Sequence, residues 1–367
     1  IVAQAYSTLV VNRCIFLWSD SSLGTYSIGL YPLGTVFRTS ISMYNSEFQA
    51  SGNKAGGGLY IGGGAIGSVV DTRITRMKAN GKSTSAPITI RSQARVYLSN
   101  INVRECLSAG NAASAIHVSQ NSEVELHNSD ISSNTGALAA IVVEGSKMNV
   151  IGTKMNFNAG QRNGSCVAAQ KSVVQIYSST LSGGSAAQGG CVWATGGLLY
   201  VWKSQVVNCT ATRLGGGIML DNLRDSARIT MGALYQTDVS GCSAGIGGGG
   251  ILAVDVLDIS TPVSGVVVEQ RVNLVMSSCR FINNTVGGFG GAVLATAASI
   301  FLDDSVFTDN YAGVAGDDVW LREASLIMSG VTSGDAMQAG SSSCELIAFD
   351  DSCDVFDEAI PESGELR

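Results

Sequence analysis

Short apolar runs recur along the chain, and small, polar or glycine-rich stretches separate them. The two best-matched copies of this pattern begin at Phe281 and Phe307, which are 26 residues apart (307 − 281 = 26). In each copy an asparagine follows the phenylalanine by three residues, and a turn with glycine and a second apolar run come next. A period of this length predicts a solenoid in which each repeat packs only against its neighbours.

The same unit can be followed through most of the chain as an apolar anchor with a small or amide-bearing residue three positions later. The anchors read Phe16, Phe48, Met77, Val103, Ile131, Met155, Leu181, Val206, Val239, Phe281, Phe307 and Val331. Two residues before the anchor, nine of the twelve positions hold Ser or Thr. The apolar runs are too short for helices, and Gly, Asn and Ser bound them, so they are predicted to be strands.

Strands that recur in this way, with no helical pattern between them, predict an all-β fold. We expect a right-handed, single-stranded parallel β-helix of about twelve coils, because parallel crossovers coil to the right. Equivalent residues of successive coils then stack at the interstrand spacing of ~4.8 Å. The β-helix is expected over residues 1–334, with a protruding loop at about 254–271, and residues 335–367 form an acidic C-terminal cap or linker.

Composition narrows the range of partners. Lys and Arg number 22 against 29 Asp and Glu, which gives a net charge of −7. Nucleic acid and anionic membranes are therefore poor partners, and no apolar run is long enough to span a bilayer. The chain starts at Ile1 without a signal-like segment, so we expect it to be a mature or excised piece of a longer precursor.

Nine cysteines make up an odd and high count. Cys166 and Cys191 occupy one column in adjacent coils, as do Cys209 and Cys242, and stacked Cα atoms ~4.8 Å apart are within reach of a disulfide. A third candidate pair, Cys344 and Cys353, closes a small local loop. The alternative is that the cysteines are small, reduced core residues.

Three Asn-x-Ser/Thr sequons add to this picture, at Asn163, Asn208 and Asn283. Together with the cysteines and the low charge they predict a secreted, extracellular glycoprotein from a eukaryote.

Candidate sites for chemistry are sparse. His is limited to two residues and no Cys-x2-Cys spacing occurs, so a zinc site is not expected. The acidic pairs Asp303–Asp304, Asp317–Asp318 and Asp350–Asp351 offer Ca²⁺ ligands, but neighbours in a strand point to opposite faces. A turn role is favoured for Asp317–Asp318, and no cofactor other than this calcium is expected.

For other conspicuous side chains, a structural interpretation is favoured over a functional one. Arg91, Arg95 and Arg104 are interpreted as a solvated face and not as part of a lyase site. Trp193, Tyr200 and Trp202 are interpreted as packing residues and not as a platform for sugar stacking.

The motifs Phe281-Ile-Asn-Asn284 and Phe307-Thr-Asp-Asn310, with Gly290-Gly291-Ala292-Val293, resemble the repeats of chlamydial polymorphic outer-membrane proteins. In loose form the pattern covers about residues 10–335. The resemblance implies a parallel β-helix of the pectin-lyase-like superfamily with a surface-exposed adhesive or structural role. Similar repeats occur in large extracellular proteins of algae and other protists.

We therefore expect a non-enzymatic structural or adhesive β-helix at a cell surface, as part of a larger surface or filament protein. Its partners would be copies of itself, other extracellular proteins or glycans. Two alternatives stay open. A polysaccharide lyase or hydrolase would be favoured by a long groove with several Asp and an Arg, and a glycan-binding module by rows of exposed aromatic residues.

Overall fold

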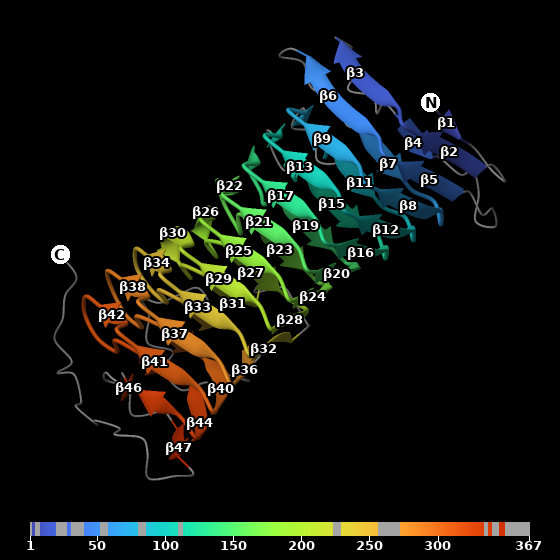
Figure 1. Ribbon diagram of the computed structural model, residues 1–367. Helices are drawn as coiled ribbons and strands as arrows, with labels where there is room; N and C mark the ends of the chain where they lie inside the picture. The colour runs from blue at the N-terminus through green and yellow to red at the C-terminus, as the bar shows by residue number, and fades with distance from the viewer. Residues whose placement is uncertain are drawn as a thin grey trace.

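The chain is a parallel β-helix, as the repeat predicts (Figure 1). The computed structural model describes residues 2–3, 8–19, 28–30, 40–51, 58–79, 86–108, 113–222, 229–255, 272–333, 337–339 and 345–348. The regular structure of these residues is all β, and the strands within each sheet pair in parallel. The described residues form no helix, and they therefore contain no helix that is long and apolar enough to cross a membrane.

Each regular coil contributes one strand to each of four sheets, A to D. In a middle coil these are β23 (Val167–Gln170) in sheet A, β24 (Val173–Tyr177) in sheet B, β25 (Thr180–Ser182) in sheet C and β26 (Ser185–Gln188) in sheet D. Among the described residues, sheets A and B have 13 strands each, sheet C has 12 and sheet D has 9. Within those residues nine coils therefore show all four strands, fewer than the twelve coils expected, and the coils toward either end show two or three strands.

Sheet B has the longest strands and sets the alternation between bore and surface. In β24 the second and fourth residues are buried, while the third and fifth are exposed. The strands of sheet B in spatial order are β2 (Thr8–Asn12), β5 (Ser40–Tyr44), β8 (Ile66–Val70), β12 (Arg95–Ser99), β16 (Glu123–His127), β20 (Lys147–Ile151), β24, β28 (Leu198–Trp202), β32 (Thr230–Tyr235), β36 (Val272–Ser277), β40 (Ala298–Asp303), β44 (Ser325–Ser329) and β47 (Glu345–Ala348).

Like residues stack along the bore. The rings of Phe281 and Phe307 are parallel within 11° and their centroids are 4.8 Å apart, which is the interstrand spacing. The Ser/Thr column forms a hydrogen-bonded ladder, in which the backbone N–H groups of Thr153 and Ser179 donate to the hydroxyls of Ser179 and Ser204, each over 3.1 Å. Buried polar groups are thereby satisfied inside an apolar core.

The pairing corrects two members of the anchor column. Strand β9 (Arg73–Thr75) places Ile74, not Met77, beside Phe48 and Val103. Met77 is buried three residues after Ile74, in the column that otherwise holds small and amide residues. Because Met77 is apolar, the sequence pattern assigned it to the anchor column in place of Ile74. At the other end Phe307 pairs with Ser333 instead of aligning with Val331.

The ends and the long insertion differ in how far the structure describes them. Strand β46 (Met337–Ala339) pairs with β43 (Val319–Arg322), and β47 pairs with β44, so parallel pairing continues past residue 334, where the β-helix was expected to end. Of the protruding loop expected at 254–271, residues 256–271 lie outside the described residues, as does most of the acidic segment 335–367.

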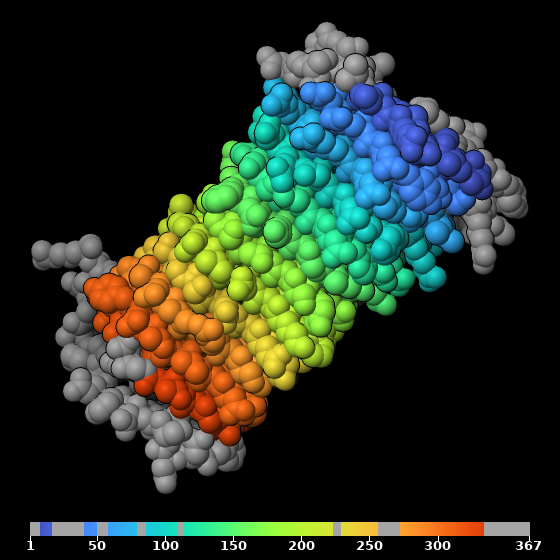
Figure 2. Space-filling model, viewed as in Figure 1, coloured from blue at the N-terminus to red at the C-terminus, as the bar shows by residue number. Residues whose placement is uncertain are grey.

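The coils follow one another as a single rod (Figure 2). The 13 levels of sheets A and B correspond to a length of roughly 58 Å at ~4.8 Å per step. A rod built in this way carries axial rows of side chains on its outer faces, because the residues of neighbouring coils are in register.

Candidate functional site: the outer face of sheet B

Two outward-facing rows of side chains run along sheet B. Register pairing aligns the last residues of five successive strands, which are His127, Ile151, Tyr177, Trp202 and Tyr235. It also aligns the middle residues of the strands β12 to β28, which are Tyr97, Glu125, Asn149, Gln175 and Tyr200. The two rows are neighbours on one face, because alternate residues of a strand point to the same side.

Three consecutive members of the first row form what we call the aromatic row, Tyr177, Trp202 and Tyr235. Their exposed fractions are 38%, 49% and 40%. Trp202 meets Tyr177 edge to face at a centroid distance of 5.7 Å and Tyr235 at 5.4 Å. Aromatic pairs prefer this geometry, so the rings hold one another in place on the surface.

The aromatic residues singled out in the sequence therefore divide between two environments. Trp193 is buried, as a packing role requires, and its indole N–H donates to Asp221 over 2.9 Å. Tyr200 and Trp202 are instead exposed on sheet B. Strand alternation explains the difference for Trp202, since it stands one residue after the buried Val201.

A groove lies beside the aromatic row. One hollow of about 360 Å³ is lined by Asn149, Ile151, Gln175, Tyr177, Tyr200 and Trp202. A second hollow of about 540 Å³ shares Asn149 and Gln175 with it and continues toward Tyr97, Arg95 and Ile66. Together they form the sheet B groove, which crosses six strands from β8 to β28, or roughly 24 Å at ~4.8 Å per strand.

The two halves of the groove differ in polarity. In the half near β12, Glu123 forms ion pairs with Arg95 at 3.3 Å and with Lys147 at 3.6 Å. All three side chains are exposed. The half near β28 is lined by aromatic rings and by the neutral amides of Asn149 and Gln175. Exposed ion pairs of this kind contribute little to stability, because water screens them.

The two histidines contact carboxylates at different places. His127 lies 3.3 Å from Glu125, next to the groove, and its ring centroid is 5.0 Å from that of Tyr97. His117 is buried on sheet A, with its Nε2 atom 3.4 Å from a carboxylate oxygen of Glu144. This contact lowers the pKa of Glu144.

The three arginines do not form one cluster. Arg91 donates to the amide oxygen of Gln120, Arg95 pairs with Glu123, and Arg104 pairs with Asp130. A solvated face was expected for these arginines in preference to a lyase site, and each arginine has a local partner.

Of the two acidic pairs that the structure describes, Asp317–Asp318 serves the local fold. Asp317 accepts a hydrogen bond from the backbone N–H of Ala312, and the fully buried Asp318 accepts from the amide of Asn310 and the hydroxyl of Ser333. A turn role for this pair is therefore confirmed. Asp350–Asp351 lies outside the described residues. Within those residues no three His, Cys, Asp or Glu side chains gather as metal ligands, and calcium stays a prediction.

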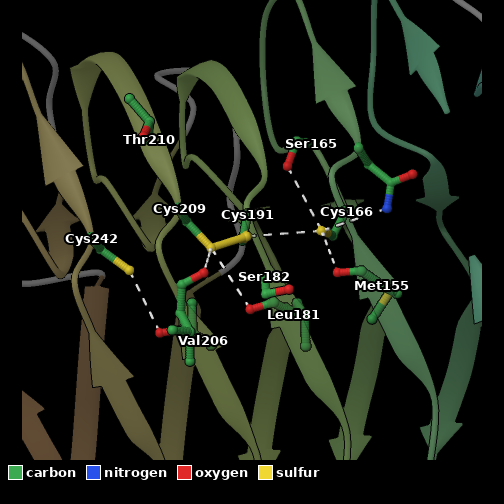
Figure 3. The surroundings of a disulfide bond; sticks show 12 residues. Met155, Ser165, Cys166, Leu181, Ser182, Cys191, Val206, Cys209, Thr210 and Cys242 are labelled. Atoms are coloured by element: carbon green, nitrogen blue, oxygen red, sulfur yellow. Dashed lines mark hydrogen bonds between the residues drawn. A yellow bond between two sulfur atoms is a disulfide. The ribbon is translucent and has the colours of Figure 1, made fainter. Parts of the chain in front are cut away.

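The cysteine pairing differs from the two axial pairs expected. A disulfide joins Cys191 to Cys209, with the Cα atoms 5.5 Å apart (Figure 3). Cys166 and Cys242 are free thiols at the two sides of this bond, and the sulfur of Cys166 lies 3.8 Å from that of Cys191. The third candidate pair, Cys344 and Cys353, lies outside the described residues.

The disulfide joins Cys191 to Cys209 because two columns of residues lie side by side inside the bore. The column of Cys166 and Cys191 lies against the column of Asn158, Gly184 and Cys209. Asn158 Nδ2 is 3.9 Å from the sulfur of Cys166. Gly184 leaves room for Cys191, since a Cβ atom there would be 2.7 Å from its sulfur. Sequence columns identify axial neighbours but give no contact between different columns.

The sequons lie on other parts of the surface. Asn208 and Asn283 are exposed at the corner between sheets C and D, where both adopt a left-handed backbone with φ of 54° and 53°. Asn163 is only half-exposed and forms an isolated backbone bridge with Gln188. Glycosylation stays a prediction at all three.

In comparisons with known proteins, no family model matches the chain, and no match is found among curated proteins or among solved structures.

Proposed function

We propose that the chain is a non-enzymatic structural and adhesive β-helix of an extracellular surface or filament protein. The observation that carries the proposal is the outer face of sheet B, where a rigid parallel scaffold presents exposed aromatic side chains in register. Contiguous exposed apolar side chains typically mark interaction surfaces. Stacked coils hold such a surface without a costly ordering step on binding.

A catalytic role on a polysaccharide is less well supported. Glycoside hydrolysis uses two carboxyl groups on either side of the scissile bond, and one of them donates a proton to the leaving group as general acid. In the sheet B groove, Glu123 is held between Arg95 and Lys147, and Glu125 contacts His127. Both carboxylates therefore have cationic or imidazole neighbours at exposed positions, an arrangement typical of surface ion pairs.

We also infer a relation to the polymorphic outer-membrane-protein repeats and the pectin-lyase-like superfamily, in a eukaryotic, algal or protist protein. The repeat motif has a structural role that supports this inference. Phe281 and Phe307 stack, and Asn284 donates its backbone and side-chain N–H groups to Asn310 over 3.0 Å each. The extracellular location rests on the sequons and on cysteine usage.

Electron microscopy of the protein isolated from its natural source tests the proposal. We expect rods joined in a regular filament, sheath or surface layer, with contacts along the rod faces or ends. Isolated rods with no ordered assembly, and no attachment to the cell surface of the source, would contradict the structural and adhesive role. An assay for cleavage of acidic polysaccharide would then become the next experiment.

A further inference from the structure

We propose that the sheet B groove and the aromatic row bind a neutral glycan chain that lies along the axis of the β-helix. The inference rests on the adhesive function proposed above and names the ligand of that face. Four observations support it: the aromatic rings, the amides beside them, the balance of charge and the direction of the groove.

The aromatic rings supply the apolar contact. Pyranose rings carry C–H groups on their faces, and these pack against aromatic rings with little loss of side-chain entropy. Trp202 is 49% exposed and stands between two tyrosines that hold its orientation. Tyr200, which is 38% exposed on the same strand, lies on the groove side of this row.

The amides supply the polar contact. Asn149 and Gln175 line both hollows of the groove, and neither side chain has a hydrogen-bond partner among the described residues. A side-chain amide offers both donors and an acceptor. This pair of functions matches neighbouring hydroxyl groups on a sugar ring, which also donate and accept.

The charges favour a neutral ligand. Two cationic side chains, Arg95 and Lys147, face two anionic ones, Glu123 and Glu125, along the groove. The half next to Trp202 is lined by no ionisable group other than tyrosine among the described residues. Because the two carboxylates offset the two cations, the groove offers a polyanionic chain such as a polyuronate no net attraction.

The direction of the groove fits a polymer. The groove crosses six strands in the direction of the axis, and each coil adds one residue to each row. The step between coils is ~4.8 Å, close to the length of one sugar unit in an extended chain. Successive units of a glycan therefore meet successive coils.

Affinity electrophoresis and titration calorimetry with soluble β-glucan, xylan and mannan test the proposal, with polygalacturonate as the anionic probe. We expect binding to at least one neutral chain. Trp202→Ala is expected to weaken it at least tenfold and Gln175→Ala severalfold. Tyr311→Ala is the matched control, because Tyr311 is a 60% exposed aromatic residue of β42 (Tyr311–Ala312) on sheet D, outside the groove.

Three results would overturn the glycan site: no binding to any neutral chain, tighter binding to polygalacturonate, or an equal loss in Trp202→Ala and Tyr311→Ala. Circular dichroism and the thermal midpoint of each variant confirm that it is folded. Attachment of protein-coated beads to the surface of source cells separates the two proposals. Attachment that Trp202→Ala leaves unchanged removes the glycan site alone, and no attachment by the unaltered protein removes the adhesive function.

Discussion

At the scale of single residues, the buried polar side chains depend most strongly on having every hydrogen-bond partner in place. Asn158 is almost fully buried and makes three short hydrogen bonds. Its Oδ1 atom accepts from the backbone and side-chain N–H groups of Asn134 over 3.0 and 3.1 Å, and its Nδ2 atom donates to the carbonyl of Ile131 over 2.7 Å. Such a ladder stabilises the coil only while every member is paired.

Replacing Asn158 by alanine should therefore lower the free energy of unfolding by about 3 kcal/mol, because two N–H groups of Asn134 lose their buried acceptor and the carbonyl of Ile131 loses its donor. Denaturant unfolding measures the loss. The matched control is Asn273→Ala on the outer face of sheet B, where the residue is half-buried and a change within about 0.5 kcal/mol is expected. Equal losses in the two variants would contradict the role of the ladder.

The free thiols give the protein a dependence on alkaline pH. Burial raises the pKa of Cys166 from 9.0 to about 11 and that of Cys242 to about 12. A raised pKa in the folded state means that the stability from these thiols is complete below the unfolded value of 9.0. It is lost progressively as the pH rises toward the higher, folded values.

We expect the thermal unfolding midpoint to fall as the pH rises from 9.0 toward about 11 and about 12, the folded pKa values of Cys166 and Cys242, and to fall less steeply in Cys242→Ala. Alkylation with iodoacetamide gives a second readout, since only the unfolded chain should react quickly at neutral pH. Parallel pH curves for the variant and the unaltered chain would show that this thiol does not contribute.

At the scale of the coil, the corners decide how closely neighbouring strands approach. Gly216 lies in the glycine-rich turn before β31 (Ile218–Asp221), and a Cβ atom there would be 2.1 Å from the carbonyl oxygen of Gly249 in the next coil. The turn therefore excludes any side chain at this position. Gly145 differs, with a φ of +54° and no heavy atom within 4 Å of the place that a Cβ atom would take.

Gly216→Ala should consequently destabilise the protein by roughly 3 kcal/mol or more, because the backbones of two coils must separate. In Gly145→Ala only the left-handed backbone is penalised, at about 1 kcal/mol. Thermal or urea unfolding of both variants checks the order. A larger loss at Gly145 would mean that backbone conformation, and not close approach, limits the turn.

At the scale of the whole molecule, the rod separates its surfaces. The sheet B groove lies on one face, whereas Asn208 and Asn283 lie on the corner between sheets C and D. The two asparagines belong to the same corner column, with Gly241 in the coil between them. Glycans there would leave the sheet B groove open.

Secretion from a eukaryotic host should yield protein glycosylated at Asn208 and Asn283, and less at Asn163, whose side chain is half-buried. Peptide mass spectrometry before and after treatment with peptide N-glycosidase measures the occupancy. Secreted protein with no glycan at either exposed site would contradict the glycoprotein assignment. Strong occupancy at Asn163 alone would contradict the reasoning from exposure.

The sequence by itself determined the features that act between neighbouring coils. The repeat predicted the all-β parallel β-helix, the stacked Phe281 and Phe307, and the Asn and Ser/Thr ladders. These follow from the period, because parallel pairing places equivalent residues side by side at one fixed spacing. Where the spacing was ambiguous, as at Ile74 and Met77, two apolar residues three positions apart both fit the pattern.

Only the tertiary structure decided which different columns meet. The disulfide between Cys191 and Cys209 joins positions of two different columns, whose relation depends on the bends between sheets. Those bends are set by corner geometry and by the packing of the bore, which a period along the sequence does not contain.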